Sequence, residues 1–470
     1  MRVALRLASA LLACIVALGC TVTHVGAADR PNIVYILADD LGWKDVGFHG
    51  GSIMTPNLDG LAQRSARLER FYSEPYSTST RAALLTGRYP MRYGLQTLSI
   101  LPWSQYGLPT GERLLPEALK EAGYRTVMLG KWQLGHYKKG YWPTQRGFDS
   151  FYGSFSGGLD CLRKTNQSFE PDWHRDERLI KEDGYCTTLL GKEAVRVIEK
   201  HDTARSLFLF LSFSAPQAPL RATKEYLNRY KDVRDEQRRT YAAMVTALDE
   251  AIGKVIAALE KKSMAADTLL VFQSDNGGAV PNKYPTGDGD VQKEVSDNGP
   301  YRDGKGSLYE GSLRVVALAS WPGKIPAGVL SESIHVTDMY PTLLRLAGAK
   351  LAQPKPVDGV DQWETLTGAK LSPRKEMLLG MEDFRGALMT GNWKLIVYSR
   401  LPVRYELYNV LDDPSEEDNH AERESERVQE MLVRLNEFAW EMAPSLYLED
   451  LLKPRTHATP AYWGDNPVRP

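Results

Sequence analysis

Short, nearly continuous apolar runs recur along most of the chain. They cover residues 32–38, 125–129, 207–214, 268–272 and 315–320. Runs of this length without polar alternation are typical of strands buried on both faces of a parallel sheet. An amphipathic helix is predicted over 241–261, where apolar side chains recur at steps of four and three at Met244, Leu248, Ile252, Val255 and Leu259. Strands that alternate with helices predict an α/β fold with a mostly parallel sheet flanked by helices.

The pattern changes near residue 387. Two short strands are predicted over 388–398 and 404–410, followed by an acidic turn at 412–414 and by a helix that carries Val428, Leu432, Leu435 and Phe438. These elements predict a smaller C-terminal α+β unit over 387–470, after a main domain over 29–386. The stretch 277–306 is rich in Gly, Asp and Pro, which is typical of a long loop that works at a site or is disordered.

The first residues have the layout of a secretory signal. Arg2 and Arg6 precede an apolar stretch over 7–18, and small residues follow as far as Ala28. We therefore expect a signal peptide over 1–28 and a secreted or periplasmic protein. No later apolar run is long enough to span a membrane.

Two of the four cysteines, Cys14 and Cys20, fall within the leader, and Cys20 lies in only a poor lipoprotein-type cleavage site. Cys161 and Cys186 remain as an even pair in an oxidising compartment, which favours a disulfide. The alternative, a zinc site that includes His174 between them, has wide and irregular spacing and is a weaker interpretation.

Composition limits the classes of partner. The 470 residues are 43% hydrophobic and 25% charged, which is ordinary for a globular protein with a large core. Lys and Arg number 58 against 59 Asp and Glu, so the formal charge is -1. This balance offers no general field for nucleic acid or an anionic membrane. Any anion site must therefore be local.

Oxygen-bearing side chains follow two of the predicted strands. Asp39 and Asp40 end the first strand, and Asp275 and Asn276 follow the fourth. In parallel sheets, ligands bind beyond the carboxyl ends of the strands. Oxygen donors without His or Cys suit a hard cation, one Ca²⁺ before Mg²⁺. The alternative is that these residues only cap helices and form turns.

A cluster of hydroxyl side chains, Ser77 to Thr80, and Arg81 precede a short apolar run over 82–85 that Gly87 closes. A hydroxyl just before a helix start faces backbone N–H groups that bind anions, and Arg81 adds further donors. Ser77 is therefore a candidate nucleophile, although a helix cap is the commoner role of such a residue. Lys131 and Lys305 are candidate anion contacts or ordinary surface lysines.

Five ordered motifs carry a family resemblance. They are NIVYILADDLGWKDVG (32–47), STRAALLTGRYP (79–90), GKWQLGH (130–136), SDNGG (274–278) and GKGSLYEGSLR (304–314). The chain resembles the type I sulfatases of the alkaline phosphatase superfamily. It looks closest to the arylsulfatase B branch, the N-acetylgalactosamine-4-sulfatases, because YGLQ (93–96) and PTQRGFD (143–149) also fit that branch.

The resemblance implies a sulfuric-ester hydrolase that acts on aryl or sugar sulfates, with a sulfated small molecule or glycan as its ligand. It implies one Ca²⁺ held by Asp39, Asp40, Asp275 and Asn276, and a sulfate pocket that includes Arg81, Lys131 and Lys305. The nucleophile position is Ser77. In this family a formylglycine-generating enzyme converts that residue, a Cys or Ser within Cys/Ser-x-Pro-x-Arg.

Departures from the family pattern favour a second hypothesis. Ser79 stands where the motif has Pro, and Gln133 and Gln217 stand where two histidines usually flank the pocket. An amide binds a sulfate oxygen but exchanges no proton near neutral pH, and such proton transfer is worth about 10²- to 10⁴-fold in rate. The alternative is therefore a catalytically impaired pseudo-sulfatase that binds sulfated glycans or a partner. A serine phosphoesterase ranks last, because the histidine-rich two-metal ligand set of such enzymes is not evident.

Overall fold

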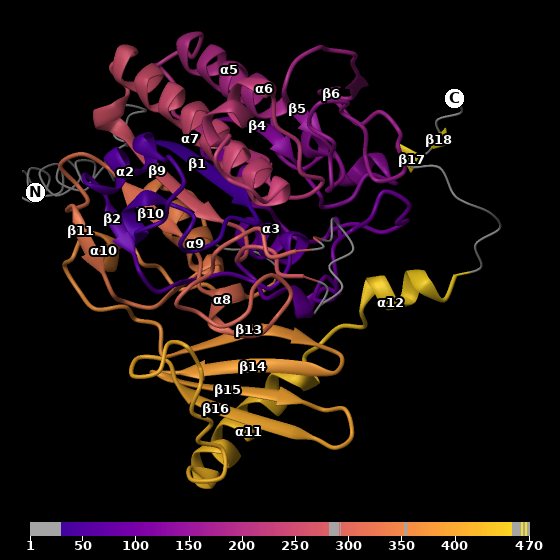
Figure 1. The fold of residues 1–470 in the computed structure, drawn as a ribbon, viewed down its shortest axis with the longest axis vertical. Helices are drawn as coiled ribbons and strands as arrows, with labels where there is room; N and C mark the ends of the chain where they lie inside the picture. The colour runs from indigo at the N-terminus through magenta and orange to yellow at the C-terminus, as the bar shows by residue number, and fades with distance from the viewer. Residues whose placement is uncertain are drawn as a thin grey trace, which may run out of the picture.

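The fold is built on one large sheet with helices on both faces, as Figure 1 shows. The computed structural model describes residues 30–281, 291, 293–351 and 355–453, together with the short strands β17 (Tyr462–Trp463) and β18 (Asn466–Pro467). The expected signal peptide, with Cys14 and Cys20, lies outside the described residues. Within them, no helix is long and apolar enough to cross a membrane.

The main sheet has ten strands in the order β11-β2-β10-β9-β1-β8-β4-β5-β6-β7. The five central strands, from β9 to β5, are parallel, and β10 and β6 continue the sheet in antiparallel fashion. The strands are β1 (Asn32–Asp39), β2 (Ala66–Leu68), β4 (Arg125–Lys131), β5 (Ser150–Ser154), β6 (His174–Arg175), β7 (Arg178–Leu179), β8 (Leu207–Pro216), β9 (Thr268–Ser274), β10 (Ala317–Ser320) and β11 (Gly328–Leu330). This arrangement confirms the predicted mostly parallel α/β fold.

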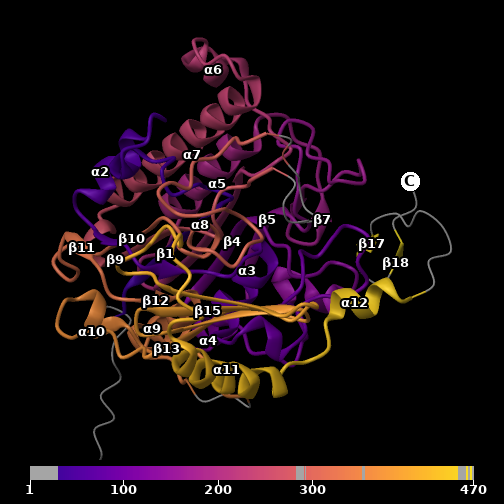
Figure 2. The same ribbon diagram turned by 60° about the horizontal axis from the view of Figure 1, so that its bottom comes forward.

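The central strand β1 feeds two hydrophobic cores because successive side chains point to opposite faces. Val34 and Ile36 pack with the helices of one face, and Ile33 and Tyr35 pack with those of the other. Figure 2 shows the two layers. The first layer contains α2 (Pro56–Ala62), α5 (Cys186–Glu199), α6 (Lys224–Leu227) and α7 (Glu236–Lys261), and the second contains α3 (Ser77–Thr86), α4 (Leu115–Glu121), α9 (Met339–Leu346) and α10 (Trp363–Leu366). A short pair, β3 (Phe71–Tyr72) and β12 (Ile334–His335), lies beside the second layer.

Two helix boundaries differ from the prediction. Helix α7 begins at Glu236, upstream of the predicted start at 241, because the side chain of Asp235 caps it by accepting the Arg238 N–H. The first turn of α7 is polar, so it adds no residue to the apolar stripe from which the helix is predicted. Helix α3 begins at Ser77 itself, so Ser77 is the first helical residue and Tyr76 is the N-cap. Gly87 ends this helix in the left-handed conformation, as its position suggested.

The C-terminal unit is an antiparallel sheet with α11 (Ser425–Trp440) packed against it, below the main sheet in Figure 1. Its strands are β13 (Glu376–Glu382), β14 (Arg385–Thr390), β15 (Trp393–Tyr398) and β16 (Arg404–Asn409). The single strand predicted over 388–398 is wrong, because a turn at Gly391 divides the stretch into β14 and β15. The sheet begins at Glu376, upstream of the expected boundary at 387. A last helix, α12 (Leu446–Leu451), follows α11.

A disulfide joins Cys161 to Cys186, which confirms the predicted pair. It ties the start of α5 to the loop that follows β5. Because both thiols are used in the bond, the zinc interpretation with His174 is wrong. His174 instead lies 3.2 Å from the Asp172 carboxylate, through its Nε2 atom.

Candidate active site

The ten predicted site residues converge at the carboxyl edge of the main sheet, and none is more than 3% exposed. Strand pairing explains the convergence, because Ala38 of β1 lies opposite Ser274 of β9, so the residues that follow each strand are neighbours. The backbone N–H of Asp40 donates to Asp275 Oδ1 at 3.2 Å. Asp40 takes a left-handed conformation, which Asp tolerates better than most residues.

The carboxylates form a group that could hold a metal ion. Ligand oxygens of Asp39, Asp40 and Asp275 all lie within 4.8 Å of one another. The side-chain amide of Asn276 joins them by donating to Asp40 Oδ1 at 2.8 Å. At the helices of the described residues none of these side chains makes a cap hydrogen bond, so the helix-capping part of the alternative is wrong for them. A buried set of oxygen donors with no Cys or His ligand suits a hard cation.

Three buried cations surround the carboxylates. Lys131 Nζ lies 2.5 Å from Asp39 Oδ2, Lys305 Nζ lies 2.9 Å from Asp40 Oδ1, and Arg81 contacts Asp275 and, at 3.3 Å, Asp39. The alternative that Lys131 and Lys305 are solvated surface lysines is wrong, because their side chains are 0% exposed. Three positive charges balance three carboxylates, so a divalent cation added to the group would give it an excess positive charge toward an anion.

These charges shift the protonation of the carboxyls in opposite directions. Burial, and next the repulsion of Asp275, raises the pKa of Asp39 to about 7, against the attraction of Lys131 and Arg81. For Asp275 burial acts in the same upward direction, but the combined attraction of the three cations holds its pKa below the usual value. Acidic groups that repel each other at this range are relieved by a bound cation.

Ser77 lies within this group. Its Oγ is 3.2 Å from Asp39 Oδ1 and 3.3 Å from Asn276 Oδ1. It does not act as a helix cap, because it occupies the first position of α3 and no cap hydrogen bond is made by a side chain there. Arg81 follows one turn later on the same helix, and its guanidinium donates to the Ser77 carbonyl at 3.3 Å. Helix α3 therefore places the hydroxyl and the guanidinium together.

The two glutamines lie near Lys131. Gln217, just after β8, accepts from Lys131 Nζ at 2.9 Å and from the Gly158 N–H at 3.3 Å through Oε1. Gln133, just after β4, has a left-handed backbone and is fully buried. The nearby His136 is also fully buried, and its Nε2 lies 2.7 Å from the Pro102 carbonyl. Burial lowers the pKa of His136, so it is neutral near pH 7.

Sequence reasoning missed supporting residues. Ser212 of β8 accepts from Arg81 at 3.2 Å, and Thr80 Oγ1 donates to the Asp275 carbonyl at 2.6 Å. No pattern in the sequence marks Ser212, and the hydroxyl cluster from Ser77 to Thr80 includes Thr80 without indicating this contact. The sequence does contain a signal for the loop at Gly157, because a pair of glycines often marks a place where another group lies close to the backbone. A Cβ there would lie 2.2 Å from Gln133 Nε2.

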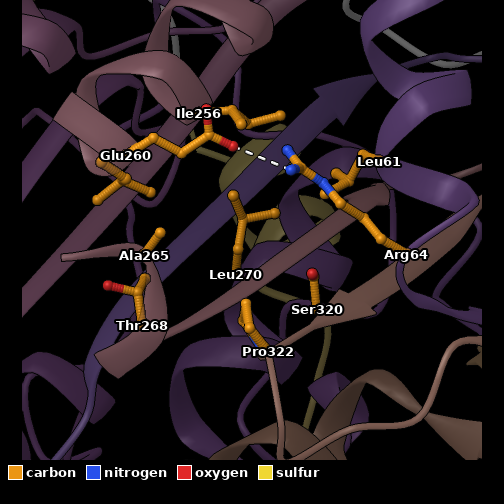
Figure 3. Close-up of a pocket in the computed structure, with 10 residues that line it drawn as sticks. Leu61, Arg64, Ile256, Glu260, Ala265, Thr268, Leu270, Ser320 and Pro322 are labelled. Carbon is orange, nitrogen blue, oxygen red and sulfur yellow. Dashed lines mark hydrogen bonds and ion pairs between the residues drawn. The ribbon is translucent and has the colours of Figure 1, made fainter. Parts of the chain in front are cut away.

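A shallow apolar pocket elsewhere is unrelated to this chemistry. Figure 3 shows it between α2, α7 and the start of β9, with Leu61, Leu270 and the exposed ion pair of Arg64 and Glu260 along its walls. Thr268, the first residue of β9, lines it. It therefore lies at the amino ends of the parallel strands, at the end of the sheet opposite to Ser77.

Comparisons with known proteins identify the family of this chain. The family model described as Sulfatase matches residues 31–349. The chain belongs to the sulfatase family. A second model, described as N-sulphoglucosamine sulphohydrolase, C-terminal, matches residues 301–441 of this sulfatase-family chain.

Relatives and solved structures support the assignment. Arylsulfatase J of Mus musculus is 36% identical over 377 residues, which cover 77% of this chain and 60% of that protein. N-acetylgalactosamine-6-sulfatase of Rattus norvegicus is 35% identical over 385 residues, which cover 77% and 70%. The crystal structure of Ps i-CgsB is 31% identical with a TM-score of 0.81 and covers 91% of this chain and 98% of its own. The resemblance to the arylsulfatase B branch stays a prediction.

One carboxyl close to the site predicts a pH effect on stability. Burial raises the pKa of Glu74, three residues before Ser77, from 4.5 to about 8. The folded chain therefore keeps a proton that the unfolded chain has lost between those pH values, so the free energy of unfolding falls as pH rises through this window. We expect Glu74→Gln to remove up to about 5 kcal/mol of this decline, at about 1.4 kcal/mol per pKa unit.

Urea denaturation of the wild type and of Glu74→Gln from pH 5 to pH 9 measures how the free energy of unfolding of each protein depends on pH. The glutamine keeps an acceptor for the Gly380 N–H, which donates to Glu74 at 3.2 Å. Parallel stability curves for the two proteins would show that Glu74 does not titrate in this window.

Proposed function

We propose that this chain is an exported sulfuric-ester hydrolase that acts on sulfate monoesters of aryl or sugar alcohols, with one Ca²⁺ at its site. The observation that carries the proposal is the position of the Ser77 hydroxyl, which lies between Asp39 and Asn276 with Arg81 on the same helix. Asp39, Asp40, Asp275 and Asn276 would hold the ion. Bound Ca²⁺ supplies positive charge that stabilises a sulfate oxygen and a developing oxyanion.

Residues of this chain would bind and orient the ester. Lys131 and Lys305 offer ammonium groups to the sulfate oxygens, and Gln133 and Gln217 offer amide donors. The amides bind an oxygen but cannot take or give the proton that the reaction moves. At these two positions the chain therefore has no residue that can protonate the leaving group, and we expect a lower rate of ester hydrolysis.

The chemical state of Ser77 decides turnover. If Ser77 is converted to formylglycine, the hydrated aldehyde has two hydroxyls on one carbon. One hydroxyl loses its proton and its oxygen attacks sulfur, while the S–O bond to the substrate breaks and the leaving oxygen takes up a proton to give the alcohol. The second hydroxyl then loses its proton, the C–O bond to the sulfate group breaks, and sulfate leaves as the aldehyde is restored. An unconverted serine would end as a sulfate ester that water must displace. Conversion would require a formylglycine-generating enzyme to accept Ser79 in place of Pro.

A cavity at the start of α3 supports a substrate larger than the sulfate group. It has a volume of about 440 Å³ and is lined by Tyr76, Phe384, Tyr398 and Arg400. Tyr76 directly precedes Ser77, and aromatic rings beside an Arg suit a sugar or aryl group. One solved relative was crystallised with k-i-k-neocarrahexaose, at a TM-score of 0.80 and 30% identity.

The test is sulfate release by protein from its native host, against an aryl sulfate, a panel of sulfated sugars and phosphate esters. Peptide mass spectrometry reads the state of residue 77, since formylglycine has two hydrogen atoms fewer than serine. We expect turnover that Ser77→Ala abolishes and that a Ca²⁺ chelator reduces at least tenfold. Serine at position 77 together with no turnover on the whole panel would contradict the proposal.

A second function is favoured by the two buried glutamines. We infer that a chain without these proton donors could still capture a sulfated glycan or regulate a partner. In that case the Ca²⁺-loaded protein binds a sulfated disaccharide without consuming it, and Lys305→Gln weakens binding at least tenfold. Affinity unaffected by Lys305→Gln would count against capture at this site.

A further inference from the structure

A fully buried ion cluster joins the C-terminal sheet to the segment that carries Lys305. Lys394 of β15 places Nζ 3.0 Å from Glu310 and 2.9 Å from Glu416, and all three side chains are 0% exposed. Glu416 also accepts the backbone N–H of Glu310 at 2.7 Å, and Tyr72 donates to Glu310 at 3.0 Å. We call Lys394, Glu310 and Glu416 the Lys394 cluster. Glu310 is the first residue of α8 (Glu310–Leu313).

The segment 304–312, which contains Glu310, contacts several parts of the site. The Gly306 N–H donates to the Pro75 carbonyl at 3.0 Å, two residues before Ser77. Next to Asn276, the Lys305 N–H donates to the Gly278 carbonyl at 3.0 Å, and the Gly277 N–H donates to Ser312 at 2.8 Å. The position of this segment therefore sets where the Lys305 ammonium meets Asp40.

Stability alone does not explain the Lys394 cluster. Removing one ammonium and two carboxylates from water is costly, and well-packed apolar side chains often serve stability as well or better. Apolar contacts are already present, because Leu308 and Leu313 pack with Met389 and Ile396 of the C-terminal sheet. The charged groups add directional hydrogen bonds, and these bonds fix the position and the orientation of the Glu310 side chain.

We propose that Lys394 is a positioning residue. Through Glu310 and Glu416 it holds segment 304–312, and thereby places the Lys305 ammonium at the anion site. The C-terminal unit is then part of the machinery that binds sulfate rather than an appendage. The inference rests on the proposed function only in treating Lys305 as a sulfate contact.

The test requires a variant that folds. Lys394→Met alone leaves buried Glu416 without its cation and leaves Glu310 only Arg314, 3.7 Å away, which destabilises strongly. The main variant therefore combines Lys394→Met, Glu310→Gln and Glu416→Gln, which is neutral and similar in volume. The matched control is Arg374→Met with Asp338→Asn. It removes another buried ion pair, whose side chains are 4% and 0% exposed. Among the described residues, the hydrogen bonds and ion pairs of these two side chains do not include segment 304–312.

Two measurements are made on the Ca²⁺-loaded full chain. Titration calorimetry with inorganic sulfate measures affinity, and hydrogen exchange followed by mass spectrometry measures protection of peptides that contain 304–312. We expect the triple variant to bind sulfate about tenfold more weakly, because small displacements of a charged contact carry large penalties. We also expect faster exchange across 304–312. The control variant should bind sulfate with wild-type affinity and should exchange hydrogen across 304–312 at the wild-type rate.

Wild-type protection of 304–312 in a folded triple variant would overturn the proposal. Where the wild-type chain does bind sulfate, an unchanged affinity in the triple variant would also overturn it, because the Lys394 cluster would then be merely structural. If the wild-type chain binds no sulfate while the triple variant loses protection only at 304–312, the positioning role stands and the proposed function fails. The two inferences are therefore separable.

Discussion

The double variant Gln133→His, Gln217→His should hydrolyse a sulfate ester about 10² to 10⁴ times faster than its parent, provided that residue 77 is formylglycine in both. The physical reason is that a histidine titrates near neutral pH whereas an amide does not. The position of Gln217 supports this expectation, because its Oε1 lies 2.9 Å from Lys131 Nζ. An imidazole in that place would lie beside a cation that lowers its pKa, so it could take up a proton during the reaction and give it to the leaving alcohol.

Conversion of residue 77 can be arranged with Ser77→Cys and Ser79→Pro, expressed with a formylglycine-generating enzyme. The fold tolerates this proline, because position 79 lies in the first turn of α3, where no intrahelical N–H bond is required. The proline loses one hydrogen bond, from Ser79 Oγ to the Leu95 carbonyl at 2.8 Å.

The measurement is kcat for an aryl sulfate, with formylglycine content read by peptide mass. Gln133→Asn, Gln217→Asn in the same converted background is the control for altered packing. Equal rates in the histidine variant and its converted parent would show that the missing proton donors are not what limits this chain.

Arg81→Met should cost about 3–5 kcal/mol of folding free energy, since it leaves the buried Asp275 carboxylate without the cation that contacts it, whereas Asp39 keeps Lys131. The Arg81 guanidinium contacts both Asp275 and Asp39, and all three side chains are 0% exposed. Added Ca²⁺ should recover part of this loss, because the ion neutralises the same carboxylates. Urea denaturation with and without Ca²⁺ at pH 7 measures both effects.

An exposed pair provides the comparison. Arg229→Met removes the ion-pair partner of Glu250, and the side chains of this pair are 33% and 30% exposed. Exposed pairs of this kind contribute about 0–1 kcal/mol to folding stability. If Arg81→Met and Arg229→Met lose similar stability, the site carboxylates are not held in the low-dielectric interior as the structure indicates. If Ca²⁺ stabilises neither Arg81→Met nor the wild type, the carboxylate group is not its binding site.

The amino-acid sequence by itself determines the layered fold and much of the site. The strands β1, β4, β8, β9 and β10 coincide with apolar runs because strands buried on both faces need continuous apolar residues. The proximity of Asp39 to Asp275 follows from their places after two such strands, because parallel strands end at the same edge of a sheet. The cysteine pair is also predictable, since only two cysteines remain outside the predicted leader.

Only the tertiary structure decided which polar residues are buried together. Lys131 and Lys305 could equally have been surface lysines, and no local pattern relates Lys394 to Glu310, which is 84 residues away. The start of α3 at Ser77 and the turn at Gly391 escape sequence reasoning too, since periodicity reports apolar faces and not the hydrogen bonds that begin a helix or divide a hairpin. Apolar periodicity is a local property of the chain. The charge partners that set protonation and geometry come from distant segments, and only folding brings them within reach.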